Sequence, residues 1–404
     1  MKQLIAKLKG SRVLFGAVVA VIVLAGLYYR LIFAYHVNFT NLHLGTELGH
    51  DEYYYSQMAV NLVERGVFGY MTDGEPNAYV TPGFPLFLAL IYAVFGHGAR
   101  SVLYVKIIQA VLSAISIFLV FLIGKKISDR LTGLIAAVMV AFYPPLIFYS
   151  RFLLTETLYI FMFLLYFLVQ LTALEQKRLA PHFAAGLLAA GAILVRPLIF
   201  ILLPLPYLYH YFTDKPGKRA ALTRFGIFAA GFVTLMLPWW IRNCVTLRQF
   251  IFLCTQTNPF YYGIIENYTE LPPTDNETAD GIKLILKHLL TNPLGTVKWY
   301  TIGKINIIFG RQDYWIQQGK MYLASLHLLH FFIIVSGALG MLTAFFKKEI
   351  RLITLFLVLN VGFQLLFIPV ERYAVPVVPL LAVCGAFMLR YLFRKPADGA
   401  SIRV

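Results

Sequence analysis

Two adjacent carboxylates, Asp51 and Glu52, stand out in a chain that is otherwise strongly apolar. They lie in the stretch Gly-His-Asp-Glu-Tyr-Tyr-Tyr of residues 49–55, soon after the first long apolar segment. A carboxylate at the edge of a membrane is partly shielded from water, and such a group can act as a general base. We therefore predict Asp51 as a base, with Glu52 and Tyr55 as substrate-binding neighbours. The structural alternative is that both acids stabilise the start of a helix. Asp51 would cap the helix, and Glu52 would interact favourably with its positive amino-terminal end.

A second acid and four arginines lie at the ends of apolar segments. Glu156 opens one such segment, and a carboxylate at that depth in a membrane usually has a function or a partner. An ion pair with Arg151 and a role in substrate binding both remain open. A single arginine at a membrane edge often contacts lipid headgroups, but a group of them suits a phosphate, because the guanidinium fork matches phosphate oxygens. The four arginines that predict this phosphate site are Arg151, Arg196, Arg242 and Arg372.

Motifs for other chemistries are missing from the sequence. It has no Asp-x-Asp pair, no histidine cluster with metal-ligand spacing and no glycine-rich phosphate loop opening a cytoplasmic helix. We therefore predict no cofactor. A divalent metal is not indicated, and a nucleotide site on the cytoplasmic side is not expected.

The elements that must position these residues are transmembrane helices. Of the 404 residues, 59% are hydrophobic and 13% are charged, which is typical of a polytopic helical membrane protein. Long unbroken apolar runs argue against the alternating pattern of a membrane barrel. We predict an all-α domain over residues 1–393 and a short tail over residues 394–404. The ten predicted spans are Val13–Tyr35, Ser101–Gly124, Leu131–Tyr149, Thr155–Leu174, His182–Val195, Leu198–Phe212, Leu222–Ile241, Tyr322–Phe346, Leu352–Ile368 and Ala374–Phe393.

The basic residues set the predicted orientation. With ten spans, the lysines and arginines of both termini and of alternate short loops fall on one side, which the positive-inside rule makes cytoplasmic. Both termini are then cytoplasmic, and the protein is expected in the inner membrane of the cell. The formal net charge of +16 is explained by this asymmetry, so we predict no nucleic-acid partner.

Two long segments fall outside in this topology, residues 36–100 and 242–321, and the chemistry is expected there. Within the first, residues 51–65 have the spacing of an amphipathic surface helix, and residues 82–96 are apolar but too short to cross. The second segment should form two short helices, Ile282–Thr291 and Pro293–Phe309.

A series of motifs follows in order along the chain. They are His-Asp-Glu-Tyr from residue 50, Thr-Pro-Gly-Phe-Pro-Leu from residue 81, Val-Phe-Gly from residue 94, Phe-Tyr-Pro-Pro-Leu-Ile-Phe-Tyr-Ser-Arg from residue 142 with Thr-Glu at 155, Leu-Val-Arg-Pro from residue 194, Leu-Pro-Trp-Trp-Ile-Arg-Asn from residue 237 and Glu-Arg-Tyr-Ala-Val-Pro-Val-Val-Pro from residue 371. Together they resemble the membrane glycosyltransferases of the GT-C superfamily over residues 1–393. The resemblance is closest to a bacterial branch with protein O-mannosyltransferase-like enzymes, the lipid A aminoarabinose transferase and galacturonosyltransferases of the lipopolysaccharide core.

The resemblance implies a polyprenyl-phosphate sugar as donor, an exterior active site and a hydroxyl acceptor on a cell-envelope glycan, lipid or protein. It also implies that Asp51 is the catalytic base and that Glu156 stands where the family often has a second acid. The aminoarabinose enzymes have a Lys-Pro pair where this chain has Thr81-Pro82. We therefore expect an arginine to contact the phosphate here. A single displacement would invert the anomeric configuration.

Two other classes of function are compatible with such a sequence. A lipid-linked sugar flippase or secondary transporter should have matching halves and polar residues at mid-membrane, whereas these polar residues gather at one side. A catalytically inactive binding or assembly subunit is the third reading. The sequence leaves the donor sugar, the acceptor and the oligomeric state open.

Overall fold

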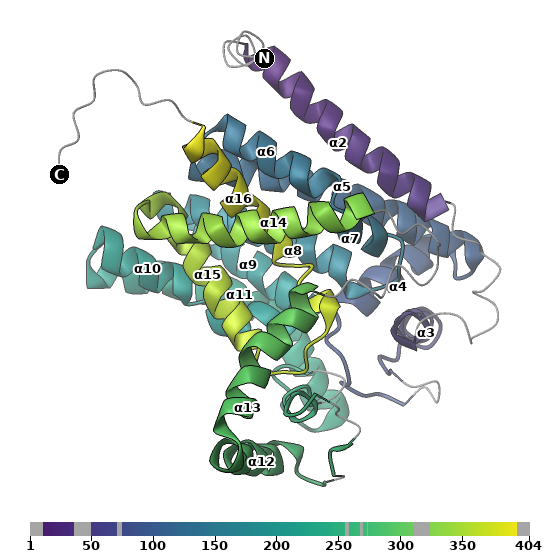
Figure 1. Cartoon of the computed structure of the whole chain (residues 1–404). Helices are drawn as coiled ribbons and strands as arrows, with labels where there is room; N and C mark the ends of the chain where they lie inside the picture. Colours follow the sequence, from purple (N-terminus) through teal and green to yellow (C-terminus); the bar gives the residue numbers. More distant parts are fainter. Residues whose placement is uncertain are drawn as a thin grey trace.

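The protein is a bundle of helices, seen here in a computed structural model (Figure 1). The structure describes residues 11–35, 50–70, 75–254, 258–266, 270–272, 274–310 and 324–393. Every regular element in these ranges is a helix, which confirms the predicted all-α class. The predicted tail and much of the predicted segment before α3 lie outside the described residues.

Five of the described helices are long and apolar enough to cross a membrane. They are α2 (Arg12–Tyr35), α5 (Ala99–Ile127), α8 (Thr155–Glu175), α11 (Lys218–Leu247) and residues Leu328–Phe345, which begin within α14 (Ala324–Leu342). Shorter apolar helices pack beside them, among them α9 (Ala180–Val195) and α16 (Val378–Leu392). The chain is therefore a multi-pass membrane protein, and the count of ten spans stays a prediction.

Two predicted spans are interrupted in the structure. The segment Leu131–Tyr149 forms α6 (Arg130–Ala141) and the short α7 (Pro144–Tyr149), and the segment Leu198–Phe212 forms the 3₁₀ helix η2 (Pro197–Leu202) and α10 (Leu205–Asp214). Prolines explain both breaks. A proline has no N–H to donate within a helix and disfavours helical geometry in the residue before it. The breaks are at Pro144, Pro145, Pro204 and Pro206.

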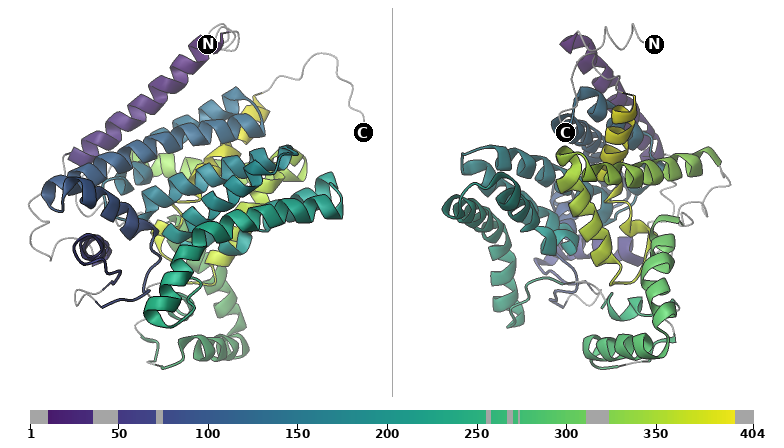
Figure 2. Two further views of the ribbon diagram at one scale, coloured as in Figure 1. Left: turned by 180° about the vertical axis from the view of Figure 1, so that it is seen from behind. Right: turned by 60° about the vertical axis from the view of Figure 1, so that its left-hand side comes forward.

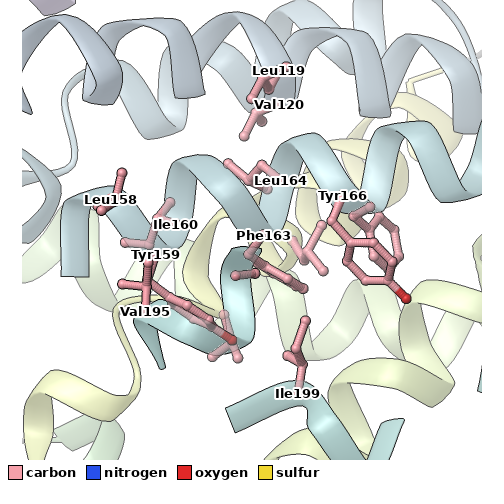
Figure 3. Close-up of a cluster of buried hydrophobic side chains, with 14 of the residues drawn as sticks. Leu119, Val120, Leu158, Tyr159, Ile160, Phe163, Leu164, Tyr166, Val195 and Ile199 are labelled. Atoms are coloured by element: carbon pink, nitrogen blue, oxygen red, sulfur yellow. The ribbon is translucent and has the colours of Figure 1, made fainter. Parts of the chain in front are cut away.

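Aromatic side chains of α8 fill the centre of the bundle (Figure 3). The Tyr159 and Phe163 rings stack with centroids 6.0 Å apart, and Phe163 also stacks at 5.6 Å on Phe356 of α15 (Lys348–Gln364). All three side chains are almost completely buried. Since lipid is as apolar as these side chains, close packing rather than escape from water holds such helices together.

Small residues allow the closest helix contacts. A Cβ added at Gly124 of α5 would lie 2.8 Å from the Cα of Gly133 in α6. One added at Gly337 of α14 would lie 2.8 Å from the carbonyl oxygen of Leu381 in α16. Any larger residue at these positions would force the helices apart.

Arg30 joins α2 to the rest of the bundle, and the sequence analysis did not single it out. Its Nε donates to the Ser113 hydroxyl at 2.7 Å, and its Nη1 donates at 2.9 Å to the carbonyls of Gly26 and Ala141. The side chain is completely buried. A buried guanidinium is tolerated in an apolar bundle because such donors are satisfied.

The bundle has two distinct ends. At one end Lys126 pairs with Glu175 at 2.5 Å and Arg390 with Asp129 at 2.8 Å, and all four residues had been predicted to lie on the cytoplasmic side. At the other end lie the helices predicted for the exterior segments (Figures 1 and 2). These are α3 (His50–Arg65), α4 (Gly83–Phe95), α12 (Glu277–Thr291) and α13 (Pro293–Lys298). The helix of α13 continues without a break to Gly310 and includes the π-helical turns Trp299–Gly303 and Asn306–Gly310, as predicted for Pro293–Phe309.

Candidate active site

Asp51 and Arg372 meet at the end of the bundle that carries α3. Asp51 is in the first turn of α3, and its Oδ2 accepts a hydrogen bond from Arg372 Nη1 at 2.8 Å. Both side chains keep some exposure, 22% for Asp51 and 30% for Arg372. The predicted base is thus paired with an arginine from the far end of the chain. The Asp51 side chain nevertheless remains partly exposed to solvent.

Glu156 extends this pair into a chain of alternating charges. Its Oε1 lies 2.7 Å from Arg196 Nη1 and 3.8 Å from Arg372 Nε. The carboxylate is 1% exposed and the arginine beside it 11%. Burial alone would lower the pKa of Arg372, but the carboxylates of Glu156 and Asp51 raise it above its ordinary value, so the guanidinium stays charged.

Helix ends bring these residues together. Leu154 is extended, so α8 starts at Thr155 and presents Glu156 in its first turn. Pro197 disfavours helix in the residue before it, and α9 accordingly ends at Val195 with Arg196 in an extended conformation. Arg372 follows α15 in the short 3₁₀ helix η9 (Glu371–Tyr373).

A cavity of about 510 Å³ opens beside this cluster. Its polar lining includes Tyr55, Arg196 and Arg372. Most of the rest of its wall is apolar, contributed by η2, by the end of α15 and by the segment around residue 253; the residues are Leu198, Phe200, Ile201, Leu253, Phe363 and Phe367. The cavity therefore offers cationic donors and an apolar surface to one ligand.

Tyr55 lies one turn after Asp51 and forms part of the cavity wall. Its ring meets those of Phe84 and Tyr70 edge to face, at centroid distances of 5.3 and 6.5 Å. Burial, with the nearby charge of Asp51, raises the pKa of Tyr55 above its ordinary range. The phenol therefore stays neutral and can donate a hydrogen bond to a ligand.

Glu52 and Arg151 have structural contacts beside the site. Glu52 is 7% exposed and accepts a hydrogen bond at 2.7 Å from the backbone N–H of Leu153. The guanidinium carbon of Arg151 lies 4.1 and 4.8 Å from the ring centroids of Phe148 and Phe152. Neither residue lines the cavity. The suggested pairing of Arg151 with Glu156 was wrong, because the chain folds so that Arg196 and Arg372 reach Glu156.

Arg242 was predicted to belong to the phosphate group, but it fastens the first predicted exterior segment to α11. It donates to the carbonyls of Asn77 at 2.9 Å and Phe68 at 2.7 Å. Its guanidinium also lies over the rings of Phe68 and Trp239. These contacts occupy the guanidinium nitrogens that would otherwise bind a phosphate. Arg242 therefore does not belong to the predicted phosphate site but positions the neighbouring backbone.

Several lining residues were missed by the sequence analysis. Tyr373 lies under the Arg196 guanidinium at 5.4 Å, and its position directly after Arg372 was the available signal. Thr81, which had been noted from the sequence together with Pro82, also lines the cavity, and its hydroxyl donates to the Val195 carbonyl at 3.2 Å. Within the described part of the chain, no three His, Cys, Asp or Glu side chains gather closely enough to hold a metal ion.

The middle of the chain is similar to a known protein family. Residues 79–241 match the family of dolichyl-phosphate-mannose-protein mannosyltransferases. This range contains Glu156 and Arg196 and ends at the residue before Arg242. No curated protein sequence matches the chain.

Solved structures show the same fold. The archaeal oligosaccharyltransferase AglB from Archaeoglobus fulgidus, in complex with an inhibitory peptide and a dolichol-phosphate, aligns with 93% of this chain at a TM-score of 0.62 and 14% identity. ArnT from Cupriavidus metallidurans, bound to undecaprenyl phosphate, aligns with 94% at a TM-score of 0.57 and 13% identity. The chain spans 50% of the AglB chain and 60% of the ArnT chain, so it covers only part of the length of either.

Proposed function

From the family match over residues 79–241 and the fold shared with AglB and ArnT, we propose that the chain is a membrane glycosyltransferase of the GT-C superfamily, related to the protein O-mannosyltransferases and to ArnT. It transfers a sugar from a polyprenyl phosphate to a hydroxyl acceptor on a glycan, lipid or protein of the cell envelope. The reaction takes place at the exterior face. One observation carries the proposal: the cavity combines two arginines with an apolar wall, and one of these arginines contacts Asp51 at 2.8 Å.

Arg196 and Arg372 bind the donor phosphate. Both line the cavity, and guanidinium groups in a poorly hydrated site interact strongly with phosphate oxygens. The polyprenyl chain lies along the apolar wall, where Phe200 and Ile201 are 37% and 56% exposed. Exposed apolar side chains of this kind offer a surface to a polyprenyl chain. The AglB structure contains a peptide and a dolichol-phosphate, and the ArnT structure contains undecaprenyl phosphate. These ligands support a lipid phosphate as donor.

Asp51 is the general base. It takes the proton of the acceptor hydroxyl as the oxygen attacks the anomeric carbon. The bond from that carbon to the phosphate oxygen breaks, its electron pair leaves with the polyprenyl monophosphate, and the transition state has oxocarbenium character, as in glycoside hydrolysis. The two arginines stabilise the charge that develops on the leaving group. A single displacement of this kind inverts the anomeric configuration.

The ion pairs of the free site couple donor binding to activation of the base. Arg372 is shared between Asp51 and Glu156, and Arg196 is paired with Glu156. A bound phosphate would compete with Asp51 for Arg372. Asp51 would then be released toward the acceptor only when the donor is present.

The test is an Asp51→Asn variant of the full chain in proteoliposomes. We expect transfer of labelled sugar from a polyprenyl-phosphate donor to be lost while donor binding, measured separately, is retained. Glu64→Gln is the matched control, because Glu64 is an exposed acid on the same helix and its loss should leave transfer unchanged.

The same assay separates the competing functions. Unchanged transfer by Asp51→Asn would reject Asp51 as the base. If the wild-type chain moves labelled lipid across the bilayer without forming a glycosylated product, the protein is a flippase. Donor binding with neither activity would indicate a binding subunit.

A further inference from the structure

A second cavity lies at the opposite end of the bundle from the candidate active site. It measures about 520 Å³ and is lined by the first half of α2, the last part of α5 and the beginning of α6. Its apolar lining includes Phe15 and Val19 of α2 and Phe121 of α5. In Figures 1 and 2 the start of α2 stands away from the other helices.

Three cations line this groove: Arg12, Lys125 and Arg130. No acidic residue is among its lining residues. Nearby cations at the same end are neutralised, since Lys126 pairs with Glu175 and Arg390 with Asp129. Among the described residues, none of the three cations Arg12, Lys125 and Arg130 forms an ion pair with a carboxylate. The groove therefore has a concentrated positive charge next to an apolar surface.

We propose that this groove binds an anionic phospholipid. Its phosphate contacts Arg12, Lys125 and Arg130, and one acyl chain lies along the apolar side of α2. Basic pockets between transmembrane helices on the cytoplasmic side are known to bind negatively charged lipid headgroups. Arginine and lysine near a membrane surface each favour anionic lipid. A bound lipid would fill the space between α2 and α5 and hold the two helices together.

Arg130 has a double part in this site. Its guanidinium lies 6.0 Å from the ring centroid of Phe15, so it borders both the charged and the apolar parts of the groove. An arginine can cover apolar surface with its stem while its head binds an anion. This geometry fits a lipid, which carries both kinds of surface, better than a small soluble anion.

Native mass spectrometry of the detergent-solubilised full chain tests the proposal. Dioleoyl phosphatidylglycerol and dioleoyl phosphatidylcholine have the same acyl chains, so they differ only in the headgroup. We expect the wild type to bind phosphatidylglycerol at least about tenfold more tightly than phosphatidylcholine. Each of the three cations should raise the affinity for the anionic lipid by roughly a few-fold, and together these contributions reach that factor. Equal affinity for the two lipids would overturn the proposal.

Two variants with matched controls locate the site. The triple variant Arg12→Gln/Lys125→Gln/Arg130→Gln should lose the preference for phosphatidylglycerol. The control Lys177→Gln/Arg178→Gln/Lys218→Gln removes as many exposed cations from outside the groove and should keep it. A similar loss in both would mean general charge attraction and would reject the groove as the site.

The groove can also be filled. A Cβ at Gly16 meets no atom within 4 Å, so Gly16→Trp can be accommodated while occupying the cavity. This variant should lose phosphatidylglycerol binding, whereas Ala17→Trp, one residue along the helix and outside the lining, should not. Undiminished binding by Gly16→Trp would contradict the proposal even if the triple variant failed to fold.

Discussion

Asp51 and Arg372 form an ion pair at 2.8 Å although 321 positions separate them in the sequence. The pair connects the first turn of α3 with η9, between α15 and α16. Through Glu156, the same arginine also contacts the start of α8. With Arg196 at the end of α9, which also pairs with Glu156, four separate segments contribute charge to one site, each at a helix end.

Arg372→Gln should weaken donor binding by roughly tenfold or more, because a hydrogen bond to a charged group contributes about 1.5–3 kcal/mol. Equilibrium binding of a polyprenyl phosphate to the purified chain measures this. Arg65→Gln, at an exposed arginine at the end of α3, should bind normally. Wild-type affinity in Arg372→Gln would remove this residue from the proposed donor site.

Glu156→Gln should destabilise the protein. The change leaves Arg196 and Arg372 close together without the buried carboxylate that they share. Breaking a buried ion pair by removing one partner costs roughly 3–5 kcal/mol. A thermal-shift assay in detergent should record a lower Tm, and the double variant Glu156→Gln/Arg196→Gln should recover part of the loss. If the two substitutions are simply additive, the pair is not coupled.

Arg30→Met should loosen α2 from the bundle. It removes donors to Ser113 and Ala141 while keeping much of the side-chain volume. Each buried acceptor left without its partner costs about 1–3 kcal/mol, so the Tm should fall. Tyr28→Phe, on the same helix at a 62% exposed position, is the control and should leave the Tm unchanged. A stable Arg30→Met protein would show that helix packing alone holds α2.

Lys304 should give the protein a pH-dependent stability above neutrality. Its ammonium is buried, donates to the carbonyls of Leu365 and Phe367, and lies 3.8 Å from the Tyr300 ring centroid. Burial lowers the pKa of Lys304 to about 7. The unfolded chain therefore holds this proton up to a higher pH than the folded chain does. Folding stability should rise between pH 7 and about 10, by at most about 1.4 kcal/mol per pH unit.

A Lys304→Met variant isolates this contribution. The Tm of the wild type relative to Lys304→Met should increase as the pH is raised from 7 to about 10. Lys298→Met, at a nearby exposed lysine, should show no such trend. A constant difference between wild type and Lys304→Met would mean that Lys304 titrates alike in the folded and unfolded states.

The predicted orientation can be tested by labelling single cysteines. In a background in which Cys244, Cys254 and Cys384 are replaced by alanine, Asp275→Cys and Lys177→Cys introduce thiols at exposed positions at the two ends. An impermeant maleimide should label Asp275→Cys in intact cells. It should label Lys177→Cys only after the membrane is opened. The reverse pattern would invert the topology.

The all-α class and the positions of most apolar helices could be predicted from the amino-acid sequence alone. Hydropathy and length are properties of consecutive residues, so the extents of α2, α5 and α8 followed from them. The helix α3 was predicted from the helical spacing of residues 51–65. Asp51 was recognisable because a carboxylate is rare in so apolar a chain.

Which charged side chains form ion pairs could not be predicted from the sequence, because it depends on the packing of the helices. Arg151 is five residues from Glu156 and Arg196 is forty away, yet Arg196 forms the close ion pair. Arg242 shares the residue type of Arg372 but is held by backbone carbonyls. The pairing of charged side chains depends on which helix ends are neighbours and on the direction of the chain after each helix ends. Hydropathy sets the depth of a residue in the membrane but not its neighbours, since packing between helices decides those.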